Sequence, residues 1–151
     1  MQSVVVSDAS CLILLDKINH LELLNKLFGQ VIITSIVGEE FGKPLPVYIR
    51  IENPKNIVYQ NILETILDKG EASSIALALE KEDCLLIIDD QKGRREARLL
   101  NVKITGTLGL IALAKEKGLI KSAREILDLI IQTDFRISKS SIENILRKAG
   151  E

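Results

Sequence analysis

The sequence predicts an α/β fold, a three-layer α/β/α domain with a central parallel sheet and extra helices at the C-terminal end. Residues 4–6, 31–33 and 85–88 are apolar throughout, as is typical of parallel strands buried on both faces. Segments with helical periodicity separate these runs. A chain of 151 residues is also long enough to bury most of its surface in one domain.

In the first half of the chain, the strand at 4–6 is followed by a helix through 12–15 and a second helix from about 20 to 28. The strand at 31–33 leads into a helix through 36–41. The segment 42–61 contains all three prolines of the chain. We expect it to cross the surface as an irregular connection, with residues 47–51 as an extended piece or edge strand.

In the second half, a helix is predicted over 71–80 and the central strand over 85–88. The later elements are a basic helix beginning at 91, a strand at 102–104, an apolar helix at 110–117, and two helices opened by Ser122 and near Ser140. We therefore expect a main unit over residues 1–120 and a helical extension over residues 121–151 that packs on the same domain.

Composition excludes several classes of protein. The chain has 20 basic and 21 acidic residues, so any nucleic-acid-binding charge must be local. Aromatic residues make up 3%, too few for base-stacking platforms. Cys11 and Cys84 form no C-x-x-C pair, and we expect both to be buried and reduced. The start of the chain has no basic region and no apolar run approaches about 20 residues, so we expect a cytoplasmic protein without membrane segments.

Three acids are predicted at strand ends. Asp89 and Asp90 directly follow the central strand, and Asp8 follows the first. Carboxyl ends of parallel strands form the edge where open α/β sheets build their sites. Asp8 has an alternative role as a helix N-cap. Because two aspartates are adjacent, either Asp89 or Asp90 could be the ligand. Asp89 is favoured because it directly ends the strand.

Two glutamates join this group from helices. Glu40 follows Ile36 and Val37 at helical spacing, so we expect it on their core-facing side; the alternative is an exposed helix acid. Glu71 lies in the first turn of its helix, beside Gly70. There the helix dipole alone would favour an acid.

Together these acids predict a metal site. Unpaired carboxylates repel one another, and a divalent cation removes that cost. Mg²⁺ prefers oxygen ligands, and a site with two ions would activate water and stabilise the leaving oxygen of a phosphodiester. The only histidine is His20, which disfavours zinc. The expected ligands are Asp8, Glu71, Asp89 and Asp90, and Glu40 completes the catalytic set.

A basic helix follows the central strand. Lys92, Arg94, Arg95 and Arg98 are candidates for steering a nucleic-acid backbone, with a solvated face partly neutralised by Glu96 as the alternative. The hydroxyl of Thr107 is a further candidate for substrate binding at the same edge. Neither G-x-G-x-x-G nor G-x-x-x-x-G-K-[ST] is present, which excludes the dinucleotide and P-loop motifs.

The ordered series of motifs resembles the PIN-domain family. It comprises Val-Val-Val-Ser-Asp-Ala-Ser, Val-Gly-Glu-Glu-Phe, Gly-Glu-Ala-Ser-Ser-Ile-Ala-Leu-Ala, Ile-Ile-Asp-Asp, Lys-Gly-Arg-Arg and Gly-Thr-Leu-Gly-Leu. The later motifs are similar to a prokaryotic subfamily related to the toxins of toxin–antitoxin pairs. The resemblance covers residues 1–120 and implies a sandwiched parallel sheet, Mg²⁺ or Mn²⁺, ribonuclease activity and dimerisation. It places the four acids of the family on Asp8, Glu40, Glu71 and either Asp89 or Asp90.

The leading hypothesis is a metal-dependent endoribonuclease, with RNA, a second copy of the chain and a small antitoxin protein as partners. The alternative is a PIN-like binding or regulatory module that cleaves nothing. A phosphoacceptor receiver ranks low, because the acid pair follows the middle strand and the lone aspartate follows the first.

Overall fold

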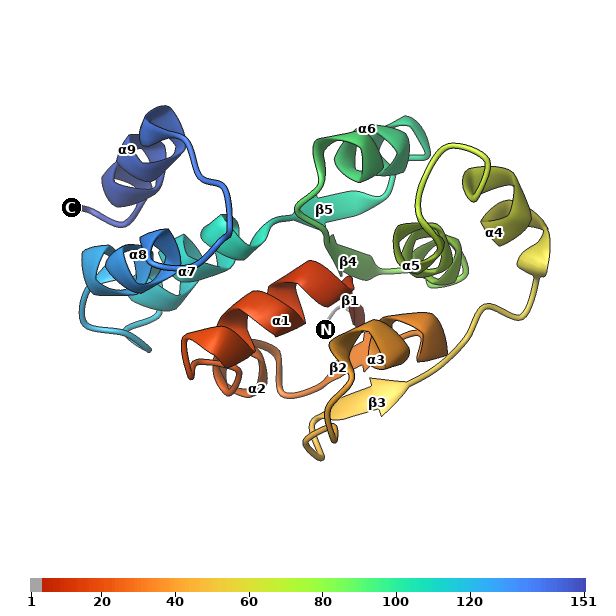
Figure 1. Ribbon diagram of the computed structural model, residues 1–151, viewed down its shortest axis with the longest axis horizontal. Helices are drawn as coiled ribbons and strands as arrows, with labels where there is room; N and C mark the ends of the chain where they lie inside the picture. Colours follow the sequence, from red (N-terminus) through yellow and green to blue (C-terminus); the bar gives the residue numbers. More distant parts are fainter. Residues whose placement is uncertain (1–3) are drawn as a thin grey trace.

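A five-stranded parallel sheet forms the centre of the computed structural model, which describes residues 4–151. The strands are arranged in the order β3-β2-β1-β4-β5 (Figure 1). All four neighbouring pairs are parallel, so the predicted α/β class is confirmed. The strands are β1 (Val4–Ser7), β2 (Val31–Ile33), β3 (Ile49–Ile51), β4 (Cys84–Ile87) and β5 (Lys103–Thr105).

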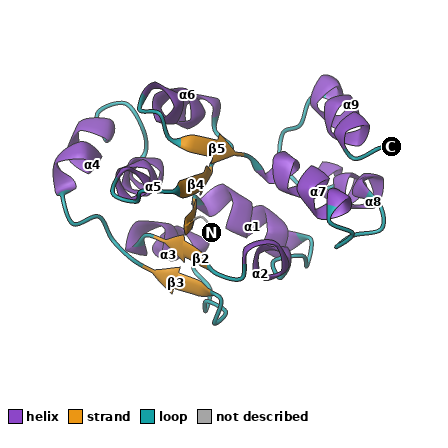
Figure 2. Ribbon diagram, turned by 180° about the vertical axis from the view of Figure 1, so that it is seen from behind, coloured by secondary structure: helices purple, strands orange, loops and turns teal. Residues whose placement is uncertain are grey.

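Helices cover both faces of the sheet (Figure 2). In chain order they are α1 (Ala9–Lys17), α2 (Leu23–Phe28), α3 (Ser35–Phe41), α4 (Ile57–Leu63), α5 (Lys69–Leu79), α6 (Gln91–Leu99), α7 (Thr107–Glu116), α8 (Ala123–Ile131) and α9 (Lys139–Lys148).

Two separate cores hold the three layers together, because alternate residues of each strand point to opposite faces. Val5 and Ile87 pack on one face against α1, α2, α3 and α7. Val6 and Leu86 pack on the other face against α4, α5 and α6. This division explains why β2 and β4 are apolar at every position and β1 at every position before Ser7.

The C-terminal helices belong to the first of these cores. Ile126 and Leu127 of α8 and Ile145 and Leu146 of α9 are buried in it together with residues of α1 and α7. Residues 121–151 therefore pack on the main unit through apolar contacts.

Several helices begin at the capping residues that the sequence offers. Ser122 accepts a hydrogen bond from the backbone N–H of Glu125 at 3.3 Å, as the capping pattern predicts. Ser138 caps α9 by accepting from Ser141 N at 3.1 Å. Helix α9 thus begins at Lys139, slightly earlier than predicted.

Helix α4 is an element that the sequence prediction placed in an irregular connection. It has few core-facing residues, since only Gln60 and Leu63 are buried. Its exposed large hydrophobic residues are Ile57, Val58, Tyr59 and Ile62. These exposed residues obscure the apolar periodicity by which a helix is predicted from sequence. The edge strand expected within 47–51 is present as β3.

The two cysteines agree with expectation. Cys11 and Cys84 are both buried and unpaired. Within residues 4–151, none of the helices is long and apolar enough to cross a bilayer.

Candidate active site

The carboxyl ends of β1 and β4 bring Asp8 and Asp89 to one edge of the sheet. The two strands are neighbours with Ser7 opposite Ile87, and the Asp8 N–H donates to the Ile87 carbonyl at 2.9 Å. Because the strands are parallel, the residues that follow them leave the sheet on the same side. Figure 1 shows α1, α6 and α7 starting from this edge.

Asp8 is buried, with 6% of its surface exposed. It occupies the N-cap position of α1 but makes no side-chain capping hydrogen bond, so the alternative role of helix cap is not what the structure shows. Burial raises the pKa of the Asp8 carboxyl to about 7, and repulsion from Asp68, Glu40 and Asp89 adds to the increase. Only the N–H of Ala9 acts in the opposite direction among these main causes. A cation beside Asp8 would therefore be favourable.

Glu71 lies in the first turn of α5 and is also buried, with 7% exposed. Burial raises the pKa of its carboxyl to about 8, followed by repulsion from Asp68, Asp90 and Asp8. A hydrogen bond with Asp90 acts in the same direction. The Oε2 atom of Glu71 lies close to Gly93 at the start of α6, where a β-carbon would be 3.3 Å away. Gly93 thus lets the glutamate reach between α5 and α6.

Glu40 extends from α3 to the start of α5. Its side chain is exposed, so the core-facing position predicted for it is wrong and the alternative of an exposed helix acid holds. The carboxylate lies directly against the backbone of Gly70, where a β-carbon would collide with Oε1. Burial and the charge of Asp68 raise its pKa. Glu40 of α3 therefore reaches the N-terminal turn of α5, the same turn that contains Glu71.

Asp68 is a member of this group that the sequence analysis did not single out. It caps α5 by accepting a hydrogen bond from Glu71 N at 2.8 Å. Its charge raises the pKa of Asp8, Glu40 and Glu71. The sequence feature that could have identified Asp68 is its position three residues before Glu71. An ordinary helix N-cap has the same sequence pattern.

Asp89 is held by several hydrogen bonds. Its Oδ1 accepts from Thr107 N at 2.7 Å, and its Oδ2 accepts from the Thr107 hydroxyl at 2.6 Å. Ser10, which was also missed, donates to the same Oδ2 at 3.1 Å. Thr107 is fully buried, so its hydroxyl orients Asp89 and has no surface for contact with a substrate.

Asp90 has different surroundings. It caps α6, where its Oδ2 accepts from Gly93 N at 3.1 Å, and its charge raises the pKa of Glu71. The structure thus places Asp90 beside Glu71, and Asp89 beside Ser10 and Thr107.

The basic residues of α6 divide into one anchored and three exposed side chains. Arg94 is half-buried and its Nη1 donates to the Ile88 carbonyl at 2.9 Å. Burial and the nearby charge of Arg98 lower its pKa, and Asp89 opposes this. Lys92, Arg95 and Arg98 are exposed. Gly106 makes room for Arg94, because a β-carbon there would lie 2.9 Å from Arg94 Nη1 and from Asp89 Oδ1.

The chemistry of the acids fits a hard divalent cation. Asp8 and Glu71 are buried, lie among other carboxylates and have raised pKa values. A divalent ion between them would remove the cost of burying their charges. No three acids, cysteines or histidines within residues 4–151 form a group that could hold a metal ion together. The expected ligands Asp8, Glu71, Asp89 and Asp90 therefore do not form one preassembled group, contrary to the prediction. A Mg²⁺ ion held by one or two carboxylates would take its other ligands from water or substrate phosphate.

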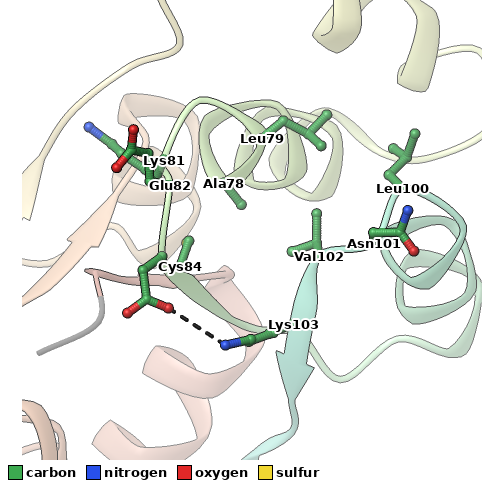
Figure 3. Close-up of a pocket in the computed structure, with 10 residues that line it drawn as sticks. Ala78, Leu79, Lys81, Glu82, Cys84, Leu100, Asn101, Val102 and Lys103 are labelled. Atoms are coloured by element: carbon green, nitrogen blue, oxygen red, sulfur yellow. Dashed lines mark ion pairs between the residues drawn. The ribbon is translucent and has the colours of Figure 1, made fainter. Parts of the chain in front are cut away.

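A different cavity, of about 210 Å³, lies at the opposite edge of the sheet. Figure 3 shows its lining at the starts of β4 and β5, including Cys84, Asn101 and Lys103. Lys103 forms an ion pair with Asp83 at 3.6 Å there. None of the predicted site residues lines this cavity, so it is separate from the acid cluster.

Comparison with known proteins identifies the family. A family model described as a PIN domain matches residues 4–151, and thus includes the two C-terminal helices. No curated protein and no solved structure matches the chain. The match covers nearly the whole chain and agrees with the parallel sheet and its helical layers. The chain therefore belongs to the PIN-domain family, whose members are generally nucleases that use divalent metal ions.

Proposed function

We propose that this protein is a metal-dependent endoribonuclease that hydrolyses RNA phosphodiester bonds. One observation carries the proposal: Asp8 and Glu71, from elements far apart in the chain, are both buried at the carboxyl edge of the sheet with raised pKa values. Burying two such acids near one another is costly unless a bound cation compensates. Clusters of perturbed carboxylates are typical of catalytic sites.

Asp8 and Glu71 are the residues that we expect to hold Mg²⁺ or Mn²⁺, with Glu40 and Asp90 beside them. When bound, the ion would supply Lewis-acid activation of water and neutralise charge on the phosphodiester. Asp68 holds the start of α5 and so positions Glu71. Both oxygens of Asp89 already accept hydrogen bonds, which supports a role in fixing the strand end.

Arg94 is the residue best placed to receive a phosphate. Its hydrogen bond to Ile88 restrains the guanidinium and leaves the other N–H donors of the group for phosphate oxygens. The exposed Lys92, Arg95 and Arg98 would attract the RNA backbone over a longer range. Asp8→Asn and Glu71→Gln keep the size of each side chain and remove its charge. We expect both variants to lose RNA cleavage in Mn²⁺, and cleavage equal to that of the native protein would refute the site assignment.

A binding or regulatory module without catalysis is the alternative function. Calorimetric titration with Mg²⁺ and Mn²⁺ distinguishes the two proposals, since a module that binds no metal would show no heat above the dilution control. The D8N variant provides the matched control, because it removes one proposed ligand.

The protein partners are further proposals. The resemblance to toxins suggests a small antitoxin protein encoded beside this chain and a homodimer in solution. Light scattering coupled to size-exclusion chromatography measures the oligomeric state. Co-purification of the product of the adjacent reading frame, followed by a cleavage assay with and without it, tests the toxin role.

A further inference from the structure

A basic groove lies beside Asp89, between helix α6 and the C-terminal helix α9. Its volume is about 610 Å³. One wall consists of residues of α6, the end of β5 and the start of α7, and the other consists of residues 135–138 and one side of α9. In the views of Figures 1 and 2, α6 and α9 are separate, and the β5–α7 connection runs between them.

Cations from both walls face this groove. Arg94 and Arg98 come from α6, and Arg136 and Lys148 come from the C-terminal segment. The single acid in the lining is Asp89. The groove is therefore strongly positive in a chain whose formal net charge is −1.

These cations are available for a ligand. None of the ion pairs found within residues 4–151 includes any of the four groove cations, whereas Lys17, Lys43, Lys81, Lys103 and Lys115 are each paired with an acid. Repulsion between Arg94 and Arg98 contributes to lowering the pKa of Arg94. A polyanion in the groove would relieve this repulsion.

The groove also leads to the acid site. Asp89 lines the groove and directly precedes Asp90, whose charge raises the pKa of Glu71. An extended phosphate chain in the groove would thus arrive at the edge of the sheet where the acids gather. Ser141 and Asn144 of α9 line the same wall and can donate hydrogen bonds to sugar or phosphate oxygens.

We propose that residues 135–148 form the second wall of an RNA-binding groove, in which Arg136 and Lys148 contact backbone phosphates next to the cleaved bond. This inference rests on the proposed nuclease function and deepens it, because it gives the C-terminal helices a role in substrate binding. Phe135 is the only aromatic residue of the lining, so recognition depends on the sugar–phosphate backbone and tolerates different base sequences.

The test compares RNA binding by full-length variants. Fluorescence anisotropy is measured with a labelled single-stranded RNA in EDTA, which prevents cleavage, over a series of salt concentrations. The test variant is R136A/K148A. The matched control is R124A/K121A, which removes one arginine and one lysine that do not line the groove and belong to no ion pair within residues 4–151.

We expect R136A/K148A to bind RNA roughly tenfold more weakly and to reduce the slope of log K against log salt by about 1.4, since each phosphate contact contributes about 0.7 for single strands. The control should match the native protein. Thermal unfolding of each variant checks that the exposed substitutions leave the fold intact. Charge reversal in R136E/K148E should weaken binding further.

Each other outcome has a definite meaning. If R136A/K148A binds like the native protein, or if the control loses as much affinity, the groove proposal is overturned while the acid site is unaffected. If the native protein binds no RNA, both the groove and the proposed substrate are overturned. The acid variants are judged separately by cleavage.

Discussion

Asp89 accepts two hydrogen bonds from one residue, the N–H and the hydroxyl of Thr107, at 2.7 and 2.6 Å. This pair joins the end of β4 to the start of α7. Since Thr107 is fully buried, water cannot replace a lost partner at low cost. Thr107, a residue buried away from solvent, thus fixes the orientation of an acid at the site.

The first prediction concerns this pair. Thr107→Val keeps the shape of the side chain but removes the hydroxyl, so we expect the free energy of unfolding to fall by about 1–3 kcal/mol. Thr107→Ser retains the hydroxyl and should recover much of this loss. Urea unfolding followed by circular dichroism measures both variants. Equal stability of Thr107→Val and the native protein would show that the hydroxyl is dispensable.

A second prediction follows from the raised pKa of Asp8. Its carboxyl has a pKa of about 7 in the folded protein against an ordinary value of 3.8, so the folded state binds the proton more tightly. The stability that Asp8 contributes without metal must then fall as the pH rises from about 4 to about 7. We expect Asp8 alone to account for a loss of about 2–4 kcal/mol between pH 5 and pH 8, measured in EDTA by urea unfolding of the native protein and Asp8→Asn.

Asp8→Asn should flatten this pH dependence and leave only the part that comes from Glu71, whose pKa is about 8. Mn²⁺ should restore stability to the native protein at pH 8, because it binds the charged form. Stability that rises from pH 5 to pH 8 in EDTA would contradict the prediction.

The third prediction uses the contact between Glu40 and Gly70. An alanine β-carbon at position 70 would collide with the Glu40 carboxylate, so Gly70→Ala must displace that side chain. Since Glu40 is exposed and can turn into solvent, the stability should change by less than about 1 kcal/mol. RNA cleavage should fall, but by no more than in Glu40→Ala, because both changes act by removing the Glu40 carboxylate from its place.

The double variant G70A/E40A provides the control. If Gly70→Ala acts through Glu40, it should add no further loss of activity in the Glu40→Ala background. Additive losses would mean that the alanine disturbs Glu71 or another part of α5.

The fourth prediction separates the two adjacent aspartates. The two oxygens of Asp89 accept hydrogen bonds from Ser10 and Thr107. Asp89→Asn leaves only one oxygen to accept them, so we expect it to reduce the free energy of unfolding by about 1–3 kcal/mol. Asp90→Asn removes a charge that raises the pKa of Glu71, and that pKa should therefore fall. Carboxyl NMR titration of Glu71 and urea unfolding measure the two effects. A larger loss of stability for Asp90→Asn than for Asp89→Asn would reverse these assignments.

Much of the sheet could be predicted from the sequence because its strands are unusual. β1, β2 and β4 are apolar at successive positions, and only a strand covered on both faces favours this pattern. The acids that follow two of these strands are then brought to one edge by geometry alone. The edge strand β3 and helix α4 were harder to predict from the sequence, because each has few buried residues.

The site was predicted less completely. Asp68 and Ser10 escaped notice because a capping aspartate and a serine near a helix start are common in any α/β protein. Thr107 was expected at the substrate, but the turn from β5 into α7 buries it under Asp89. The packing of α5 against α6 decides that Glu71 lies near Asp90. A local sequence pattern contains no information on this packing.

The sequence by itself determined the class of fold, the parallel strands and the placing of acids at their ends, since periodicity and chain direction act over a few residues. Only the tertiary structure decided that Glu40 lies against Gly70, that Asp90 rather than Asp89 adjoins Glu71, and that Arg136 faces α6 across a groove. These relations join segments distant in the chain. They arise from how the layers pack, which no local preference of the backbone can specify.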